Sequence, residues 1–299
     1  MKIDKIVFCT SEEFSPFWNI QSYLWKEKIG VEPVCLLWGK ASNTNMKDTY
    51  GEIIEKEYNP DLMRSFQMTW SKFYHTLSEP DTTWMIGDMD LVPLQKEWFT
   101  TAIEDLPDDA YTHLAFGEIP KIAGKPEDLF LREGGYANGN GGMDLAAYYH
   151  VAKGSIFNKA LGLDECSFGE QINRVIEDGR FGMGPSLGLS REQISRQFAH
   201  IPIPPEERYY WCADENYSSY RIWNSHQEGK ITFHNHITPK GKQVDRIDRS
   251  HALWDGDVVH SYPQYEPLPP IDVHCCRPYG SQESALRDLV QDCWKSWHE

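Results

Sequence analysis

The chain is predicted to have an α/β fold, in which a mixed, mainly parallel central sheet of Rossmann type is flanked by helices. Three observations support this prediction. Apolar strands alternate with helical segments over residues 5–94. Small polar or acidic residues follow these strands, as they do at the ligand-binding edge of a parallel sheet. A last amphipathic segment near the C-terminus predicts a tail helix.

The first strands and helices follow one another regularly. "KIVFCTS" at residues 5–11, "EPVCLLWG" at 32–39 and "TTWMIGDMDLVPL" at 82–94 are apolar runs typical of strands. Helical spacing joins them over residues 17–30, which end at a glycine, and 60–77, which begin at a proline. This order of elements predicts parallel strands connected by crossover helices.

The second half of the chain alternates less strictly. A glycine-rich stretch at residues 134–142 precedes a helical run, and it permits either close backbone approach to a ligand or a flexible loop. Residues 178–207 are rich in Gly and Pro and predict an irregular excursion. Further strands are predicted at 111–119 and 230–238, with a helix at 214–223.

Bulk composition limits the class of protein. The formal net charge of −16 repels phosphate backbones and anionic lipid heads, so nucleic acid is not expected as a partner. The 7 cysteines are odd in number and lack CxxC spacing, which indicates reduced thiols and no disulfide framework. Neither a signal peptide nor a membrane-spanning stretch is evident, and a cytoplasmic location is expected.

The segment "GDMDL" places two carboxylates, Asp88 and Asp90, at the end of an apolar strand. Buried carboxylates are costly unless something compensates their charge. Residues at i and i+2 of a strand share a face, and hard divalent cations prefer oxygen ligands. Asp88 and Asp90 are therefore predicted to bind a divalent metal, Mn²⁺ or Mg²⁺. The alternative is a pair of solvated turn aspartates.

An α/β unit followed by an apolar strand ending in "GDMDLVPL" resembles the GT-A fold nucleotide-sugar glycosyltransferases, over roughly residues 5–242. The resemblance implies a GT-A-like fold and a DxD metal site that bridges the diphosphate of a nucleotide-sugar donor, with UDP the expected nucleotide. It implies a catalytic domain over residues 1–260, with a donor-binding part at about 1–120 and an acceptor-side part at about 121–260. Residues 261–299 would form a Pro-rich connector and the tail helix, which either packs on the domain or contacts a partner.

A second constellation resembles later motifs of the same family. Asp214 and Glu215 begin a helical segment, where the resemblance implies an acidic pair that supplies the catalytic base. His234 and His236 alternate on a later strand, where it implies a histidine that completes the metal site. Asp-Glu stands where Glu-Asp is usual, so the base is either Glu215 or Asp214. The alternative role of the pair is favourable charge at a helix N-terminus.

Glu170 is a rival catalytic or sugar-binding carboxylate. Its segment "GEQIN" resembles a segment that lines the donor sugar in some members of the family, and a plain amphipathic helix is the alternative. A zinc site built from His274, Cys275 and Cys276 is disfavoured because the adjacent cysteines have poor chelate spacing.

Further contacts to the donor are inferred from position in the fold. Thr10 and Ser11, at the end of the first strand, would lie against the nucleoside, and Arg64 would reach the phosphates. Lys240 or Lys242 would pair with the diphosphate as a point charge.

The leading hypothesis is a metal-dependent glycosyltransferase, hexosyl or pentosyl, which moves a sugar from a nucleotide-diphosphate donor to a hydroxyl of a glycan, lipid or protein. A base would take the acceptor proton, and the metal would stabilise the leaving diphosphate. A sugar nucleotidyltransferase is the second hypothesis, although the loop "TSEEFSPFW" is acidic and aromatic where that class is glycine-rich and basic. A non-catalytic sugar-binding or scaffold protein with a degenerate site is the third.

Overall fold

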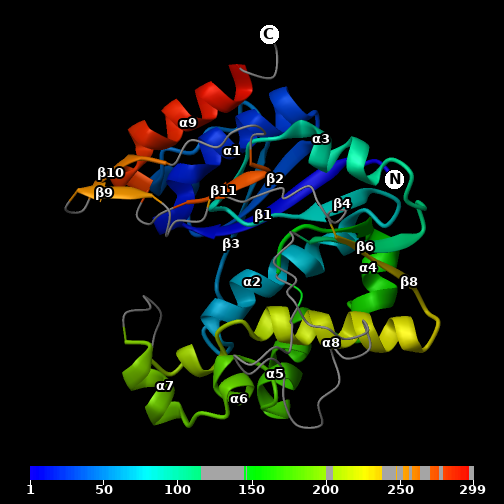
Figure 1. The fold of residues 1–299 in the computed structure, drawn as a ribbon. Coiled ribbons are helices and arrows are strands. Elements are labelled where there is room, and N and C mark those ends of the chain that lie inside the picture. Colours follow the sequence, from blue (N-terminus) through cyan, green and yellow to red (C-terminus); the bar gives the residue numbers. More distant parts are fainter. Residues whose placement is uncertain are drawn as a thin grey trace.

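A computed structural model describes residues 1–115, 145, 147–199, 205–237, 247, 252–255, 258–262, 270–275 and 279–295. Seven strands form the central sheet in the order β3-β2-β1-β4-β7-β6-β8 (Figure 1). Strand β7 runs antiparallel to β4 and β6, and the other neighbouring pairs are parallel, which confirms the mixed, mainly parallel sheet. The strands are β1 (Lys5–Ser11), β2 (Glu32–Trp38), β3 (Glu52–Lys56), β4 (Thr83–Ile86), β6 (Ala110–Ala115), β7 (His150–Lys153) and β8 (Thr232–Ile237).

Side chains of the strands alternate between two hydrophobic cores, one on each face of the sheet. In β1, Ile6 and Phe8 belong to the first core, whereas Val7 and Cys9 belong to the second. Helices α1, α3 and α9 cover the first face, and α2, α4, α5 and α8 lie on the other side (Figure 1). They span Trp18–Tyr23, Lys96–Phe99, Glu283–Lys295, Arg64–His75, Gly154–Leu161, Phe168–Asp178 and Ala213–Gln227, respectively.

The helix predicted at 17–30 is present but irregular. A 3₁₀ turn at Glu12–Phe17 precedes α1, and a π-helical turn at Leu24–Ile29 follows it. Gly30 ends the helix in the left-handed conformation, with a φ of 90°, and the chain enters β2. The second predicted helix is α2, which begins at Arg64 and not at the proline.

The prediction of a single strand over residues 82–94 is wrong. The structure divides this segment into β4 and β5 (Leu91–Pro93), with residues 87–90 between them. Strand β5 leaves the central sheet and pairs antiparallel with β11 (Asp272–His274). The two aspartates of the DxD segment therefore stand between two sheets, at the carboxyl end of β4.

Gly87 is the residue at which the chain leaves β4. Its amide still donates a hydrogen bond to the carbonyl of Val7, at 2.8 Å. A Cβ atom at this position would lie 2.5 Å from the ring of Phe8, closer than real Cβ atoms approach. The glycine therefore lets the backbone pass directly over β1 before the aspartates.

Two strands of the sheet are absent from the sequence prediction. Strand β3 is a half-exposed edge strand whose sequence, "EIIEK", is too charged and short to stand out. Strand β7 lies inside the helical run that was expected after the glycine-rich stretch, so that prediction is wrong for residues 150–153. Four residues are too few to show a period, and α4 follows directly. The glycine-rich stretch at 134–142 lies outside the described residues.

Short elements occupy the predicted irregular excursion and the C-terminal region. Helices α6 (Met183–Leu187) and α7 (Arg191–Gln197) fall within the excursion. Strands β9 (Leu253–Asp255) and β10 (Val258–Ser261) form an antiparallel hairpin. Most of the proposed Pro-rich connector lies outside the described residues.

The predicted tail helix is confirmed as α9, and its apolar side packs on the chain's own core. Leu286 and Trp294 are buried in the first core, and the Trp294 indole donates to the carbonyl of Pro93 at 3.3 Å. The structure thus follows the packing alternative and gives no support to a partner-binding face on this side of α9. Among the described helices, none has the length and apolarity to cross a membrane.

Candidate active site

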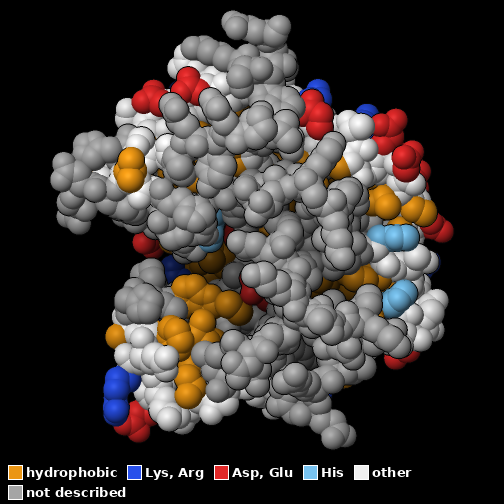
Figure 2. All heavy atoms as spheres, viewed as in Figure 1, with side chains coloured by type: hydrophobic (Ala, Val, Ile, Leu, Met, Phe, Trp, Pro, Cys, Tyr) orange, Lys and Arg blue, Asp and Glu red, His pale blue; other side chains and the backbone are white. Residues whose placement is uncertain are grey.

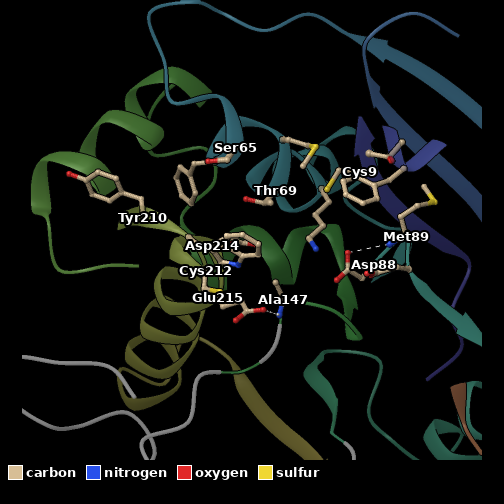
Figure 3. Close-up of a pocket in the computed structure, with 17 residues that line it drawn as sticks. Cys9, Ser65, Thr69, Asp88, Met89, Ala147, Tyr210, Cys212, Asp214 and Glu215 are labelled. Atoms are coloured by element: carbon tan, nitrogen blue, oxygen red, sulfur yellow. Dashed lines mark hydrogen bonds between the residues drawn. The ribbon is translucent and has the colours of Figure 1, made fainter. Parts of the chain in front are cut away.

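A cavity of about 210 Å³ opens between the carboxyl end of β1, residues 87–90 between β4 and β5 (the DxD turn), helix α2 and the start of α8. Figure 3 shows Asp88 on one side of this cavity and Asp214 and Glu215 on another. In the space-filling view, apolar side chains gather beside a recess, near α6 and α7 (Figure 2). The lining residues are Cys9, Thr10, Phe14, Ser65, Phe66, Met68, Thr69, Lys72, Asp88, Met89, Asp90, Ala147, Tyr210, Trp211, Cys212, Asp214 and Glu215.

The DxD turn is fixed by hydrogen bonds on both sides. The amide of Leu91 donates to the Asp88 carbonyl at 3.1 Å, which closes the turn. The buried Gln21 side chain donates to the carbonyls of Met89 and Leu91, at 3.0 and 2.7 Å. Since its backbone is held in this way, the turn presents Asp88 and Asp90 to the cavity in a defined orientation.

His274 lies beside Asp90. Its Nε2 atom is 3.6 Å from Oδ2 of Asp90, and the amide of Cys275 donates to the Asp90 carbonyl at 2.8 Å. The antiparallel pairing of β11 with β5 creates this contact, because His274 pairs with Leu91. In the sequence, His274 was a candidate only for the disfavoured zinc site with Cys275 and Cys276, and Cys276 lies outside the described residues.

The donor set at this point suits a divalent cation. Two ligands of one six-coordinate ion with bonds near 2.1 Å stand about 3–4 Å apart, and the Asp90–His274 distance falls in that range. Asp90 is 3% exposed, so its carboxylate needs a compensating charge. Among the described residues no three His, Cys, Asp or Glu side chains form a complete site, so the remaining ligands would come from elsewhere.

The two histidines predicted as metal ligands lie on β8, away from the lining of the cavity. His234 pairs with Thr112 of β6, and β8 stands three strands from β4 in the sheet order. At about 4.8 Å per strand this separation is roughly 14 Å. The side chain of His236 lies outside the described residues. The histidine that the structure brings to the DxD turn is therefore His274.

Lys72 is a charged residue of this cavity that none of the sequence motifs includes. It is 2% exposed, lines the cavity, and its Nζ lies 3.5 Å from the Gly87 carbonyl. Burial lowers the pKa of Lys72, but the charges of Asp88, Asp214 and Glu215 outweigh it and raise the pKa. The sequence could have indicated this residue, because helical spacing places Ser65, Thr69 and Lys72 on one face of α2.

Asp214 and Glu215 stand in the first turn of α8, as the sequence predicts for a helix start. Burial raises the pKa of Asp214, Lys72 opposes the rise, and Asp88 adds to it. Glu215 is half-buried and accepts a hydrogen bond from the amide of Ala147 at 3.4 Å. The residue before the helix, Cys212, has a φ of 62°, which is uncommon for a non-glycine residue and more frequent near functional sites.

Thr10, Ser11 and Arg64 are the other residues predicted to contact the donor. Thr10 lines the cavity, whereas Ser11 does not. The Arg64 guanidinium lies over the ring of Tyr58, at 4.4 Å from its centroid, and Lys72 faces the cavity from the same helix.

Glu170 serves a structural purpose. Its carboxylate accepts hydrogen bonds from the amide and hydroxyl of Ser167, at 2.8 and 2.7 Å, and completes a capping box at the start of α5. It does not line the cavity. The structure therefore favours the helix alternative for this residue. Lys240 and Lys242 lie outside the described residues.

Comparison with known proteins gives matches among solved structures only. No protein-family model and no curated protein matches the chain. The galactosyltransferase LgtC in complex with donor and acceptor sugar analogues matches 96% of this chain and 95% of its own, at 12% identity and a TM-score of 0.44. An active-site mutant of LgtC matches over the same shares at 13% identity and a TM-score of 0.44. The glycosyltransferase GlyE of Streptococcus pneumoniae TIGR4 matches 83% of this chain and 68% of its own, at 14% identity and a TM-score of 0.33.

Proposed function

We propose that the chain is a metal-dependent glycosyltransferase that transfers a hexosyl or pentosyl group from a nucleotide-diphosphate sugar, with UDP as the nucleotide. One observation carries the proposal. Two acidic pairs that are far apart in the sequence, Asp88 with Asp90 and Asp214 with Glu215, line the same cavity. Lys72 is the one basic residue among the described residues that line it. Such a site suits a substrate that is anionic at one end and rich in hydroxyls at the other.

The donor end of the site is assigned to the DxD turn. Asp88, Asp90 and His274 would hold Mn²⁺ or Mg²⁺, with further ligands from the donor and solvent. The cation, when bound, stabilises the charge that develops on the leaving diphosphate. Lys72 keeps its ammonium group in the cavity beside Asp88, and its positive charge attracts the donor and limits repulsion among the carboxylates.

The acceptor end is assigned to the start of α8. A base that removes the proton from an acceptor hydroxyl works best when its pKa lies close to the working pH. Burial raises the pKa of Asp214 towards the working pH, so Asp214 is assigned as the base. Glu215, oriented by the amide of Ala147, would accept a hydrogen bond from the acceptor. The acceptor is a hydroxyl on a glycan, a lipid-linked sugar or a protein.

The donor class is tested by a thermal-shift panel of UDP-, GDP- and TDP-sugars with Mn²⁺, followed by turnover assays of the sugars that stabilise the protein. UDP-sugars should raise the melting temperature in a Mn²⁺-dependent way. Asp90→Ala should abolish both the shift and the turnover while the circular dichroism spectrum stays unchanged. Undiminished turnover by this variant would exclude the proposed metal site.

The histidine assignment has its own test, which needs no substrate. Electron paramagnetic resonance counts free Mn²⁺ and so measures metal affinity directly. His274→Ala should weaken Mn²⁺ binding by at least about tenfold. His234→Ala is the matched control and should leave it unchanged, since His234 lies on β8. The opposite ranking of the two variants would restore the sequence-based assignment.

A further inference from the structure

Helix α2 begins without a cap of its own. Its N-cap residue is Met63, whose side chain makes no capping hydrogen bond. The first amides of the helix are instead satisfied from a distant part of the chain. Glu207 accepts hydrogen bonds from the amides of Arg64, at 3.0 Å through Oε1, and Ser65, at 2.9 Å through Oε2. A carboxylate is favoured here because the helix N-terminus carries partial positive charge.

The two segments that Glu207 joins form different walls of the active-site cavity. Ser65 and Phe66 line it from α2. Tyr210, Trp211 and Cys212 line it from the segment that follows Glu207. Glu207 itself does not line the cavity, so its effect on a bound substrate is indirect.

The backbone couples Glu207 closely to the residues that do line the cavity. The amide of Tyr210 donates to the Glu207 carbonyl at 3.0 Å, within one 3₁₀ turn at Arg208–Tyr210. A displacement of Glu207 therefore moves Tyr210. The segment is also attached to α6, because the amide of Met183 donates to the Trp211 carbonyl at 2.7 Å. The bond from Met183 holds this segment to α6, whereas the Glu207 carboxylate holds it to α2.

We propose that Glu207 is a positioning residue that holds the Tyr210–Trp211 wall of the cavity against helix α2. Its carboxylate sets the distance between the two walls, and with it the fit of the sugar that lies between the DxD turn and α8. The consequence for substrate binding rests on the proposed function, whereas the mechanical tie between the walls does not.

Helix capping alone would also account for the two hydrogen bonds, and the test separates the two roles. Glu207→Ala removes the tie and the cap together. Adding Met63→Asp to that variant supplies a local cap at the N-cap position, but nothing that reaches the opposite wall. Glu206→Ala is the matched control, since Glu206 is exposed and carries the same charge one residue earlier.

Three measurements are made on each protein: amide hydrogen exchange of residues 208–212, the melting temperature, and calorimetric binding of UDP with Mn²⁺. Glu207→Ala should exchange at least about tenfold faster over this segment and melt about 2–4 °C lower. The double variant should recover the melting temperature but keep the fast exchange. Glu206→Ala should match the wild type in exchange rate, melting temperature and UDP affinity. UDP affinity should fall about tenfold in both proteins that lack Glu207.

Slow exchange in Glu207→Ala, or its return to the wild-type rate when Met63→Asp is added, would overturn the proposal, because Glu207 would then act only as a cap. If the wild type binds no UDP while the exchange results are as expected, the proposed function fails and the tie between the walls stands. Wild-type UDP affinity in a protein with fast exchange would overturn the link between wall position and binding.

Discussion

At the scale of single residues, the buried lysine explains how several acids can line one small cavity. A lysine that is 2% exposed would ordinarily lose its charge, because burial favours the neutral amine. In this site Asp88, Asp214 and Glu215 surround Lys72 and stabilise the ammonium form. The same charge lowers the pKa of Asp214 against the effect of burial. Under the proposed function, Lys72 would therefore adjust both the attraction for an anionic donor and the basicity of Asp214.

Replacement of Lys72 by Met tests this coupling. Loss of the ammonium group removes the one contribution from a basic side chain that lowers the pKa of Asp214, so that pKa should rise further. Activity that requires ionised Asp214 should then decline at higher pH than in the wild type, by about one pH unit on the acidic limb of the pH–rate profile. Lys159→Met, at an exposed position on α4, is the control. If the acidic limb lies at the same pH in Lys72→Met and in the wild type, Lys72 does not influence the pKa of the base.

His75 gives a second prediction, for stability. Burial lowers the pKa of His75 to about 4, and Lys56 adds to the effect. Below pH 6.5 the His75 imidazole is protonated in the unfolded chain but stays neutral in the folded protein. The free energy of unfolding therefore falls as the pH is lowered, until the pH reaches about 4. Partial exposure limits the loss to about 2 kcal/mol.

Urea unfolding at pH 7 and pH 4.5 measures this contribution. His75→Gln should lose less stability between the two pH values than the wild type, because Gln does not titrate. Equal losses in the wild type and His75→Gln would show that other groups cause the acid sensitivity.

At the scale of secondary-structure elements, the site depends on how β4 ends. The sequence predicts an apolar strand with two aspartates, and the structure places both aspartates after β4, in the lining of the cavity. It does not predict that the strand breaks at Gly87 and resumes as β5, because the apolar pattern continues across the break. Nor does it predict the partner of β5. That partner, β11, comes from the C-terminal region and brings His274 to Asp90.

Gly87→Ala tests the role of this break. The added Cβ would meet the Phe8 ring at 2.5 Å and the end of Ile6 at 3.0 Å, both in the packed core. The substitution should lower the free energy of unfolding by about 1–3 kcal/mol and weaken Mn²⁺ binding, since the DxD turn must shift. Gly169→Ala is the control, because its nearest contact is at 3.4 Å and the site is helical. Unchanged stability and metal affinity in Gly87→Ala would mean that the turn tolerates a side chain.

At the scale of the whole molecule, the site is assembled from distant parts of the chain. The cavity is lined by residues from β1, α2, the DxD turn and α8, and His274 of β11 lies 3.6 Å from Asp90. The local sequence pattern predicts most of these elements, because each one has a recognisable hydrophobic period or a residue that marks its end. It could not predict contacts between distant segments, such as His274 with Asp90 or Glu207 with α2, because these depend on tertiary packing. The buried Lys72 belongs to none of the predicted motifs, although the sequence spacing places it on the same helix face as Ser65 and Thr69.

Calorimetric titration of UDP into the wild type and Asp90→Ala, each with and without Mn²⁺, decides whether the DxD turn forms a metal-dependent nucleotide site. We expect saturable binding of one UDP per chain to the wild type with Mn²⁺. That binding should weaken by at least about a hundredfold when the metal is chelated or Asp90 is replaced. UDP binding of equal strength in all four titrations would contradict a metal-dependent nucleotide site at the DxD turn.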